Sequence, residues 1–272
     1  DDSDCDVDGL DGGTTGFVRQ LWNANELPTD EAMCCWGDDG ISSFNFNQYT
    51  SSHPMLQGFY YRLYTGIDYC NHYLEKCADY DATITAEARF LRALMYFNLV
   101  RYFGGVPIVL HDGEGEGAPR NSVDEVYEQI VSDFTAAESL PAGFTTLDSK
   151  ASSLAASALL SKVYLTWAQT SSEKGKANQS AYYQKAIDYA QKVIDSGKYS
   201  LLDKFIDNWS VDKKNGPEHI FSIEHDRTVN GNITGHCTFA TNWSDAEPVL
   251  LATSDRYYEE SDGKDQRRAG SW

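Results

Sequence analysis

Basic residues are scarce in this chain of 272 residues. It has 22 Lys and Arg against 41 Asp and Glu, which gives a formal net charge of −19 at pH 7. A nucleic acid has to be met by clustered Lys and Arg, and no basic cluster here exceeds a pair such as Arg267-Arg268. We therefore expect no nucleic-acid partner. The same charge repels anionic polymers and favours a neutral ligand or a cationic partner.

Long apolar runs are also missing. The longest nearly apolar stretch, around Leu154–Ala168, is interrupted by Ser161, Lys162 and Thr166, so we expect no membrane span. The chain has no charged segment followed by an apolar one at its start, which predicts that any export signal has been removed.

The cysteines lack the spacing of a metal-binding or redox motif. The six cysteines are irregularly placed and form no C-x-x-C motif: Cys5, Cys34, Cys35, Cys70, Cys77 and Cys237. This excludes a zinc ribbon or a thioredoxin-type centre. Cys70 and Cys77 lie seven residues apart on a predicted helix, about 10 Å in rise, which is too far for a disulfide.

Motifs that carry catalysis or hold a cofactor are absent as well. There is no G-x-S-x-G, P-loop or G-x-G-x-x-G, and the glycines of 113–117 alternate with acidic residues that would repel phosphate. His219 and Glu224-His225 lack the spacing of a metallohydrolase. We expect no cofactor and no catalytic residue.

An incomplete calcium-loop pattern stands at the start of the chain. Asp4, Asp6, Asp8 and Gly9 match the first half of the motif, but Thr15 occupies the twelfth position, where a bidentate Glu is expected. We interpret this stretch as an acidic tail and expect no bound metal.

What the sequence does contain is a series of amphipathic segments. Apolar residues recur at helical spacing in five of them, which predicts helices at about 59–74, 86–103, 122–141, 152–168 and 181–196. The second is apolar almost all round and belongs at the centre of a bundle. The third opens with a capping box, Ser122 and Glu125. The fifth carries a stripe of Tyr183, Ile187, Ala190 and Ile194, and is capped by Gly197.

These helices predict the fold class and its divisions. We expect a mostly α protein of tetratricopeptide-like stacked helical hairpins, with an irregular loop-rich region and a few short strands, one of them at 220–224. The predicted divisions are an acidic, loop-rich segment over 1–58 that faces the ligand, a helical scaffold over 59–201, and the start of a second irregular region over 202–272.

The helical block resembles a known family. The run AEARFLRALMYFNLVRYFGGVPIVL, residues 86–110, is similar to the E-A-R-F-L-R-A helix, double-Gly turn and Val-Pro extension of the SusD-like (RagB/SusD) outer-membrane nutrient-binding lipoproteins. Flanking matches follow in family order: TDEA at 29–32, the helix with Asn71 at 59–77, the helices at 122–141, 153–168 and 186–201, and EHIFSIEHD at 218–226.

The resemblance implies a function at the cell surface. Members capture glycans without catalysis and act as a lid on a SusC-like TonB-dependent transporter. The implied location is the outer membrane, reached through an N-terminal lipid. The residues before Cys5, Asp1 to Asp4, are not the remnant of a lipobox, so we expect the anchor to lie upstream of this chain or to be absent. The RagB branch of the family implies peptide capture as an alternative. A glycoside hydrolase is a less favoured alternative, because no pair of carboxylates is singled out by a motif.

Candidate ligand-binding residues combine aromatic rings with amides or carboxylates, which together fit the C–H face and the hydroxyls of a sugar. Loop 36–49 holds most of them, and in SusD-like proteins this stretch often lines the glycan site. The candidates in this loop are Trp36, Asp38, Asp39, Asn45, Asn47 and Tyr49, and Phe44 belongs to the same cluster. Two further candidates, Trp209 and Trp243, each stand beside an asparagine.

Overall fold

The computed structural model describes residues 21, 24–29, 32–34, 42–115, 117–143, 150–210, 215–223 and 251–253. The chain divides into two compact units. One comprises Asp1–Arg62 and His225–Trp272, and the other, the helical unit, comprises Leu63–Glu224. The divisions expected at residues 58 and 201 stay a prediction.

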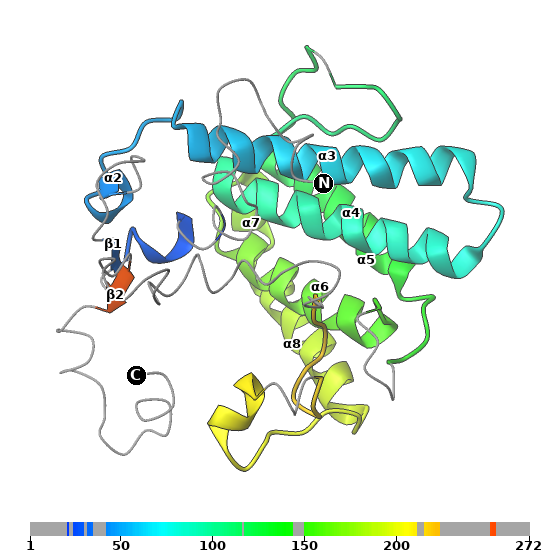
Figure 1. Cartoon of the computed structure of the whole chain (residues 1–272). Coiled ribbons are helices and arrows are strands. Elements are labelled where there is room, and N and C mark those ends of the chain that lie inside the picture. The colour runs from blue at the N-terminus through cyan, green and yellow to red at the C-terminus, as the bar shows by residue number, and fades with distance from the viewer. Residues whose placement is uncertain are drawn as a thin grey trace. The chain divides into compact units, whose positions relative to one another are not determined.

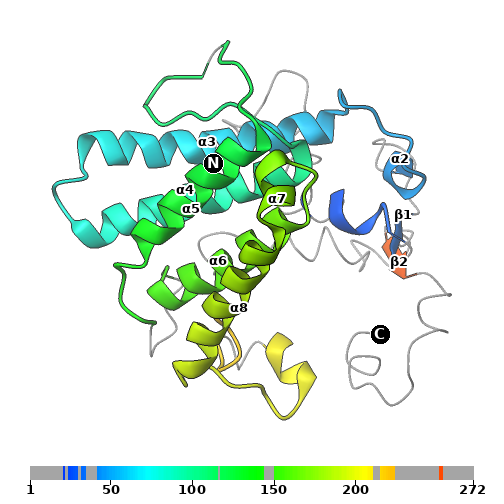
Figure 2. The same ribbon diagram turned by 180° about the vertical axis from the view of Figure 1, so that it is seen from behind.

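The described residues are mostly helical, which confirms the predicted fold class. Figures 1 and 2 show α3, α4 and α5 side by side, and α6 beside α8. The described helices include α2 (Ser42–Asn45), α3 (Pro54–Lys76), α4 (Ala82–Phe103), α5 (Val123–Ala137), α6 (Ser153–Ala168), α7 (Glu173–Ala177), α8 (Gln179–Asp195) and the 3-10 helix η2 (Phe205–Trp209). The five predicted helices correspond to α3, α4, α5, α6 and α8.

Helix α4 packs against both α3 and α5, which agrees with the central position that its sequence predicts. Phe90, Ala93 and Phe97 are buried. Gly66 of α3 lies against Met95 of α4, where an added Cβ would be 3.2 Å from the Met95 Cε. The added methyl group would therefore meet only the flexible side chain of Met95, and no backbone atom is among its nearest neighbours.

The ends of the helices follow local capping chemistry. Asp81 accepts a 2.7 Å hydrogen bond from the Thr83 amide at the start of α4. The predicted capping box of α5 is confirmed, because Ser122 Oγ accepts from the Glu125 amide and the Glu125 carboxylate accepts from the Ser122 amide. Gly197 takes a φ of 63° after α8, which confirms its predicted role.

Helices α6 and α8 form a hairpin that buries one stripe of α8. Ser161 Oγ donates to the Ala186 carbonyl at 2.7 Å, and Tyr182 and Val193 are buried with Ala186. The stripe predicted from the sequence is wrong by one position, because Ile187 is 59% and Ile194 is 68% exposed.

The physical reason for this shift lies in the aromatic rings. Tyr182 packs 4.4 Å from the Trp167 ring, and Tyr189 stacks 5.9 Å from the Tyr164 ring. Large rings bury more apolar area than two isoleucines, so helix α8 turns these tyrosines toward α6.

A helix that the sequence did not predict follows α6. Helix α7 lies in the stretch that was expected only as a connection, and Asp124 of α5 fixes its start. The Asp124 carboxylate accepts from Trp167 Nε1 at 2.7 Å and from the Lys174 amide at 2.9 Å. Burial by itself raises the pKa of Asp124, but hydrogen bonds from Ser172, Lys174 and Trp167 outweigh it and bring the pKa below its usual value.

The strand expected at 220–224 is wrong for residues 220–223, which are not part of a strand. The half-buried Phe221 ring instead packs edge-on against Phe90 of α4, with 5.0 Å between centroids, and this contact takes the place of strand pairing. The described strands belong to the other unit. Strands β1 (Ala32–Cys34) and β2 (Leu251–Thr253) pair antiparallel, with Met33 opposite Ala252.

Candidate glycan-binding site

The candidate site is a short loop between α2 (Ser42–Asn45) and the start of α3. The single turn of α2 is closed by two backbone hydrogen bonds, from the Asn47 amide to the Phe44 carbonyl (3.1 Å) and from the Gln48 amide to the Ser43 carbonyl (2.9 Å). Asn47 takes a left-handed φ of 52°, a conformation that Asn tolerates better than most residues. The chain therefore turns sharply and projects residues 46–49.

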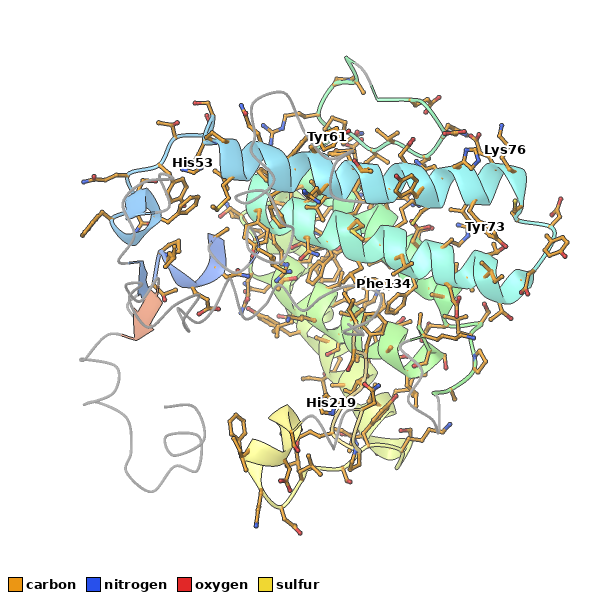
Figure 3. All side chains as sticks on the ribbon, in the orientation of Figure 1. His53, Tyr61, Tyr73, Lys76, Phe134 and His219 are labelled. Carbon is orange, nitrogen blue, oxygen red and sulfur yellow. The ribbon has the colours of Figure 1, made fainter. Side chains whose placement is uncertain are left out.

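A buried ring supports an exposed one in this loop. Phe44 is fully buried and stacks on Tyr49, with 4.4 Å between ring centroids and 22° between planes. His53, labelled in Figure 3 just before α3, meets Phe44 edge-on at 4.9 Å. Tyr49 is 37% exposed. The Tyr49 ring is thus held in place on one face and partly exposed to solvent, so it is preorganised to contact a ligand.

Phe46 is a further candidate that the sequence analysis missed. Its side chain is 67% exposed, beside the exposed Asn47 and Gln48. The alternation of Phe44, Asn45, Phe46 and Asn47 offers a sequence signal for one ring inside and one outside, but it does not say which is which. The structure assigns Phe44 to the inside, so Phe44 supports the site and does not contact a ligand.

The predicted site residues have different outcomes. Asn47 and Tyr49 lie together on the exposed loop, and Asn45 is the last residue of α2. Trp209 ends η2 in the helical unit. The remaining candidates lie outside the described residues: Trp36, Asp38, Asp39 and Trp243.

The most distinctive motif of the sequence forms a buried network and not a ligand site. Arg92, from the E-A-R-F-L-R-A run, donates to both carboxylate oxygens of Asp133 in α5 at 2.8 Å. It also donates to Asn71 Oδ1 in α3 at 2.8 Å, and Asn71 Nδ2 donates to the Val109 carbonyl at 3.0 Å. All three residues are buried, with at most 5% of each residue's surface exposed. The motif therefore joins three helices to the segment after the double-Gly turn.

Pairing with Asp133 favours the charged form of Arg92. Burial disfavours the charged guanidinium, but the hydrogen bonds and the negative charge of Asp133 outweigh burial and raise the pKa of Arg92. Arg89 and Gln129 also donate to the Asp133 carboxylate, at 3.3 and 3.0 Å. The hydrogen-bond partners of Arg92 and Asp133 are side chains of the helical unit itself, so this ion pair has a structural role.

Other kinds of site find no support in the part of the chain that the structure describes. Within it, no group of three or more His, Cys, Asp or Glu side chains could hold a metal ion. None of its helices combines the length and the apolar character needed to cross a bilayer.

Comparison with known proteins gives a consistent set of similarities. A family model described as "Starch-binding associating with outer membrane", SusD-like, matches residues 20–165. The starch-binding protein SusD of Bacteroides thetaiotaomicron is 29% identical over 248 residues, covering 86% of this chain and 43% of its own length.

Solved structures add the fold. A SusD superfamily protein from Parabacteroides distasonis superposes with a TM-score of 0.78 at 26% identity, covering 92% of this chain and 55% of its own. A laminarin-binding SusD-like protein superposes with a TM-score of 0.64 at 26% identity, covering 79% of this chain and 50% of its own. The chain thus spans about half the length of the relatives it matches.

Proposed function

Because this chain belongs to the SusD-like family, we propose that it binds a neutral polysaccharide or oligosaccharide without catalysing a reaction, at the loop of residues 42–53. The observation that carries the proposal is the Tyr49 ring, stacked on buried Phe44 and open to solvent beside Phe46 and Asn47. Rings of this kind cover the C–H face of a sugar, and the Asn47 amide bonds its hydroxyls. Relatives named as starch-binding and laminarin-binding support the ligand class.

Binding without catalysis fits the composition of the loop. Hydrolysis of a glycosidic bond requires two carboxyl groups at a fixed separation, and residues 42–53 contain no Asp or Glu. Apart from His53, whose ring packs against Phe44, the polar side chains of the loop are hydroxyls and amides, which hold a sugar and do not transfer protons at neutral pH. The net charge of −19 favours a neutral ligand over an anionic one.

The proposal extends to the setting of the protein. It delivers the glycan to a SusC-like TonB-dependent transporter, from a position at the cell surface held by an N-terminal lipid on the outer membrane. The family model's description, which names association with the outer membrane, supports this extension. Capture of peptides for a similar transporter is the competing outcome.

Affinity gel electrophoresis with neutral glycans tests the binding site. The chain is expected to be retarded by one member of a panel that includes starch and laminarin. Tyr49→Ala and Phe46→Ala should each weaken retardation about fivefold to tenfold, since a stacked ring contributes about 1–1.5 kcal/mol. Tyr80→Ala is the matched control, because Tyr80 is 91% exposed in the turn between α3 and α4. It should bind as the parent does.

The alternatives give distinct readouts in the same experiment. Release of reducing sugar from the panel would point to a hydrolase. Oligopeptides that co-purify in native mass spectrometry, together with no retardation by any glycan, would favour peptide capture. Retardation that Tyr49→Ala and Phe46→Ala leave unchanged would move the site away from this loop.

A further inference from the structure

Helix α8 carries two apolar stripes, and one of them is covered. The inner stripe, with Tyr182, Ala186 and Val193, is buried against α6. The outer stripe follows the same spacing one residue later and comprises Tyr183, Ile187, Ala190 and Ile194. Ile187 is 59% exposed and Ile194 is 68% exposed. Two isoleucines two turns apart on one helix face form a continuous apolar row.

The outer stripe has an acidic border. Asp188 and Asp195 lie one residue beyond Ile187 and Ile194, seven residues apart. Each carboxylate is held by a glutamine one turn before it, from Gln184 Nε2 at 2.8 Å and from Gln191 Nε2 at 2.6 Å. The border is therefore an ordered row of negative charge along the helix.

Both lysines of α8 are directed away from this border. Lys185 Nζ lies 4.7 Å above the ring of Tyr164 in α6, and Lys192 Nζ pairs with Glu138 at 2.5 Å. The positive charges of α8 thus serve the packed side of the helix. The outer side combines an apolar row with acidic groups, which is the complement of an apolar row bordered by basic groups.

We propose that the outer stripe of α8 is a docking surface for an amphipathic helix whose apolar row is bordered by Lys or Arg. Helices dock in this way through anchors at i, i+3, i+4 and i+7 positions. A second copy of this chain is a poor occupant, because each copy has a net charge of −19 and would bring an acidic border against its own kind. The proposal does not depend on glycan binding, since α8 and the loop of residues 42–53 belong to different units.

Fluorescence anisotropy tests the surface with two synthetic helical peptides. Both carry leucine at the stripe positions, and the flanking positions are lysine in one and glutamate in the other. The full chain should bind the lysine peptide more tightly. The double variant Ile187→Ser/Ile194→Ser should weaken this binding about tenfold, because two partly exposed apolar anchors are lost. Ile223→Ser, at a residue that is 65% exposed and outside α8, is the control and should bind as the parent does.

A charge exchange separates docking from general stickiness. The double variant Asp188→Lys/Asp195→Lys should reverse the preference, so that the glutamate peptide binds more tightly than the lysine peptide. Circular dichroism on each variant checks that the helices are retained. Equal binding of the parent and the serine double variant, or an unchanged preference after charge exchange, would overturn the proposal. So would a dimer seen by analytical ultracentrifugation that the serine substitutions dissociate, because the occupant would then be a second copy.

Discussion

At the scale of single residues, Arg92 shows how a charge can be kept inside the helical unit. Its guanidinium bonds both oxygens of Asp133 and the side chain of Asn71, while the side chains of Arg92 and Asp133 are 6% and 0% exposed. An ion pair of this kind is costly to desolvate, and its value lies in geometry: it fixes α3, α4 and α5 in one register. The removal of Arg92 leaves the buried Asp133 carboxylate with only Gln129 and the partly exposed Arg89 as partners.

Arg92→Met is therefore expected to destabilise the chain by about 3–5 kcal/mol, measured as the free energy of unfolding in urea. The double variant Arg92→Met/Asp133→Leu should recover most of that loss, because it buries no unpaired charge. Lys174→Met, which removes the exposed partner of Glu128, is the control and should cost at most about 1 kcal/mol. A double variant as unstable as the single one would argue against the pairing as the cause.

Cys70 and Cys77 differ in their surroundings. Cys70 is 8% exposed on α3, and burial, which outweighs a lowering by the charge of Arg92, raises the pKa of its thiol to about 11. Since the thiolate is the reactive form, little of Cys70 is reactive at pH 8. Cys77 is exposed after the end of α3.

Iodoacetamide at pH 8 should therefore label Cys77 and leave Cys70 unmodified, as read by peptide mass spectrometry. The Cys70 peptide should become labelled once urea unfolds the chain, which also serves as the control for detection. Labelling of Cys70 at the rate of Cys77 in the folded chain would contradict its burial.

At the scale of elements, the turn after α4 depends on the hydrogen bonds of Arg120 and on the close packing of Gly105 against Asn121. Arg120 donates to the carbonyls of Phe103 and Gly105 at 2.5 and 2.6 Å, which satisfies the end of the helix. A Cβ on Gly105 would lie 2.2 Å from the Asn121 carbonyl oxygen. The second glycine of the double-Gly turn is therefore required by sterics, because backbone atoms cannot move aside cheaply.

Two glycine substitutions separate this effect from ordinary helix propensity. Gly105→Ala should destabilise the chain by about 3 kcal/mol. Gly66→Ala meets only the flexible end of Met95 and gains about 1 kcal/mol of helix propensity, so it should lie within about 1 kcal/mol of the parent. Thermal unfolding followed by circular dichroism compares them. A Gly105→Ala variant as stable as the parent would show that the turn can move.

At the scale of the whole molecule, we expect the net charge to govern which glycan the proposed site accepts. A chain with a formal charge of −19 repels carboxylated and sulfated polysaccharides and leaves neutral glycans unaffected. A neutral ligand held by rings and amides has no counterions to release, so its affinity should not depend on screening.

The affinity for the neutral glycan should therefore change by less than about twofold between 50 mM and 500 mM NaCl, roughly a threefold range of Debye length. Isothermal titration at both salt concentrations measures it. A sulfated analogue of the same glycan is the control and should bind more weakly at low salt than at high salt. A steep loss of affinity with salt would point to a charged ligand and away from the proposal.

Part of the candidate site could be predicted from the sequence and part could not. The mixture of rings and amides around Asn47 and Tyr49 identified the loop, because composition is a local property. The choice between Phe44 and Phe46 depended on the turn at Asn47 and on the position of His53. Both rings have the same chemistry, so no rule of composition could assign one to the inside.

The sequence by itself determined the five long helices, the caps at Ser122 and Gly197, and the family. Capping at Ser122 and Gly197, and the periodicity of the five helices, depend on residues a few positions apart. Only the tertiary structure decided which stripe of α8 is buried and that Arg92 pairs with Asp133, 41 residues away. Burial is set by partners that are distant in the chain, and periodicity alone does not identify them.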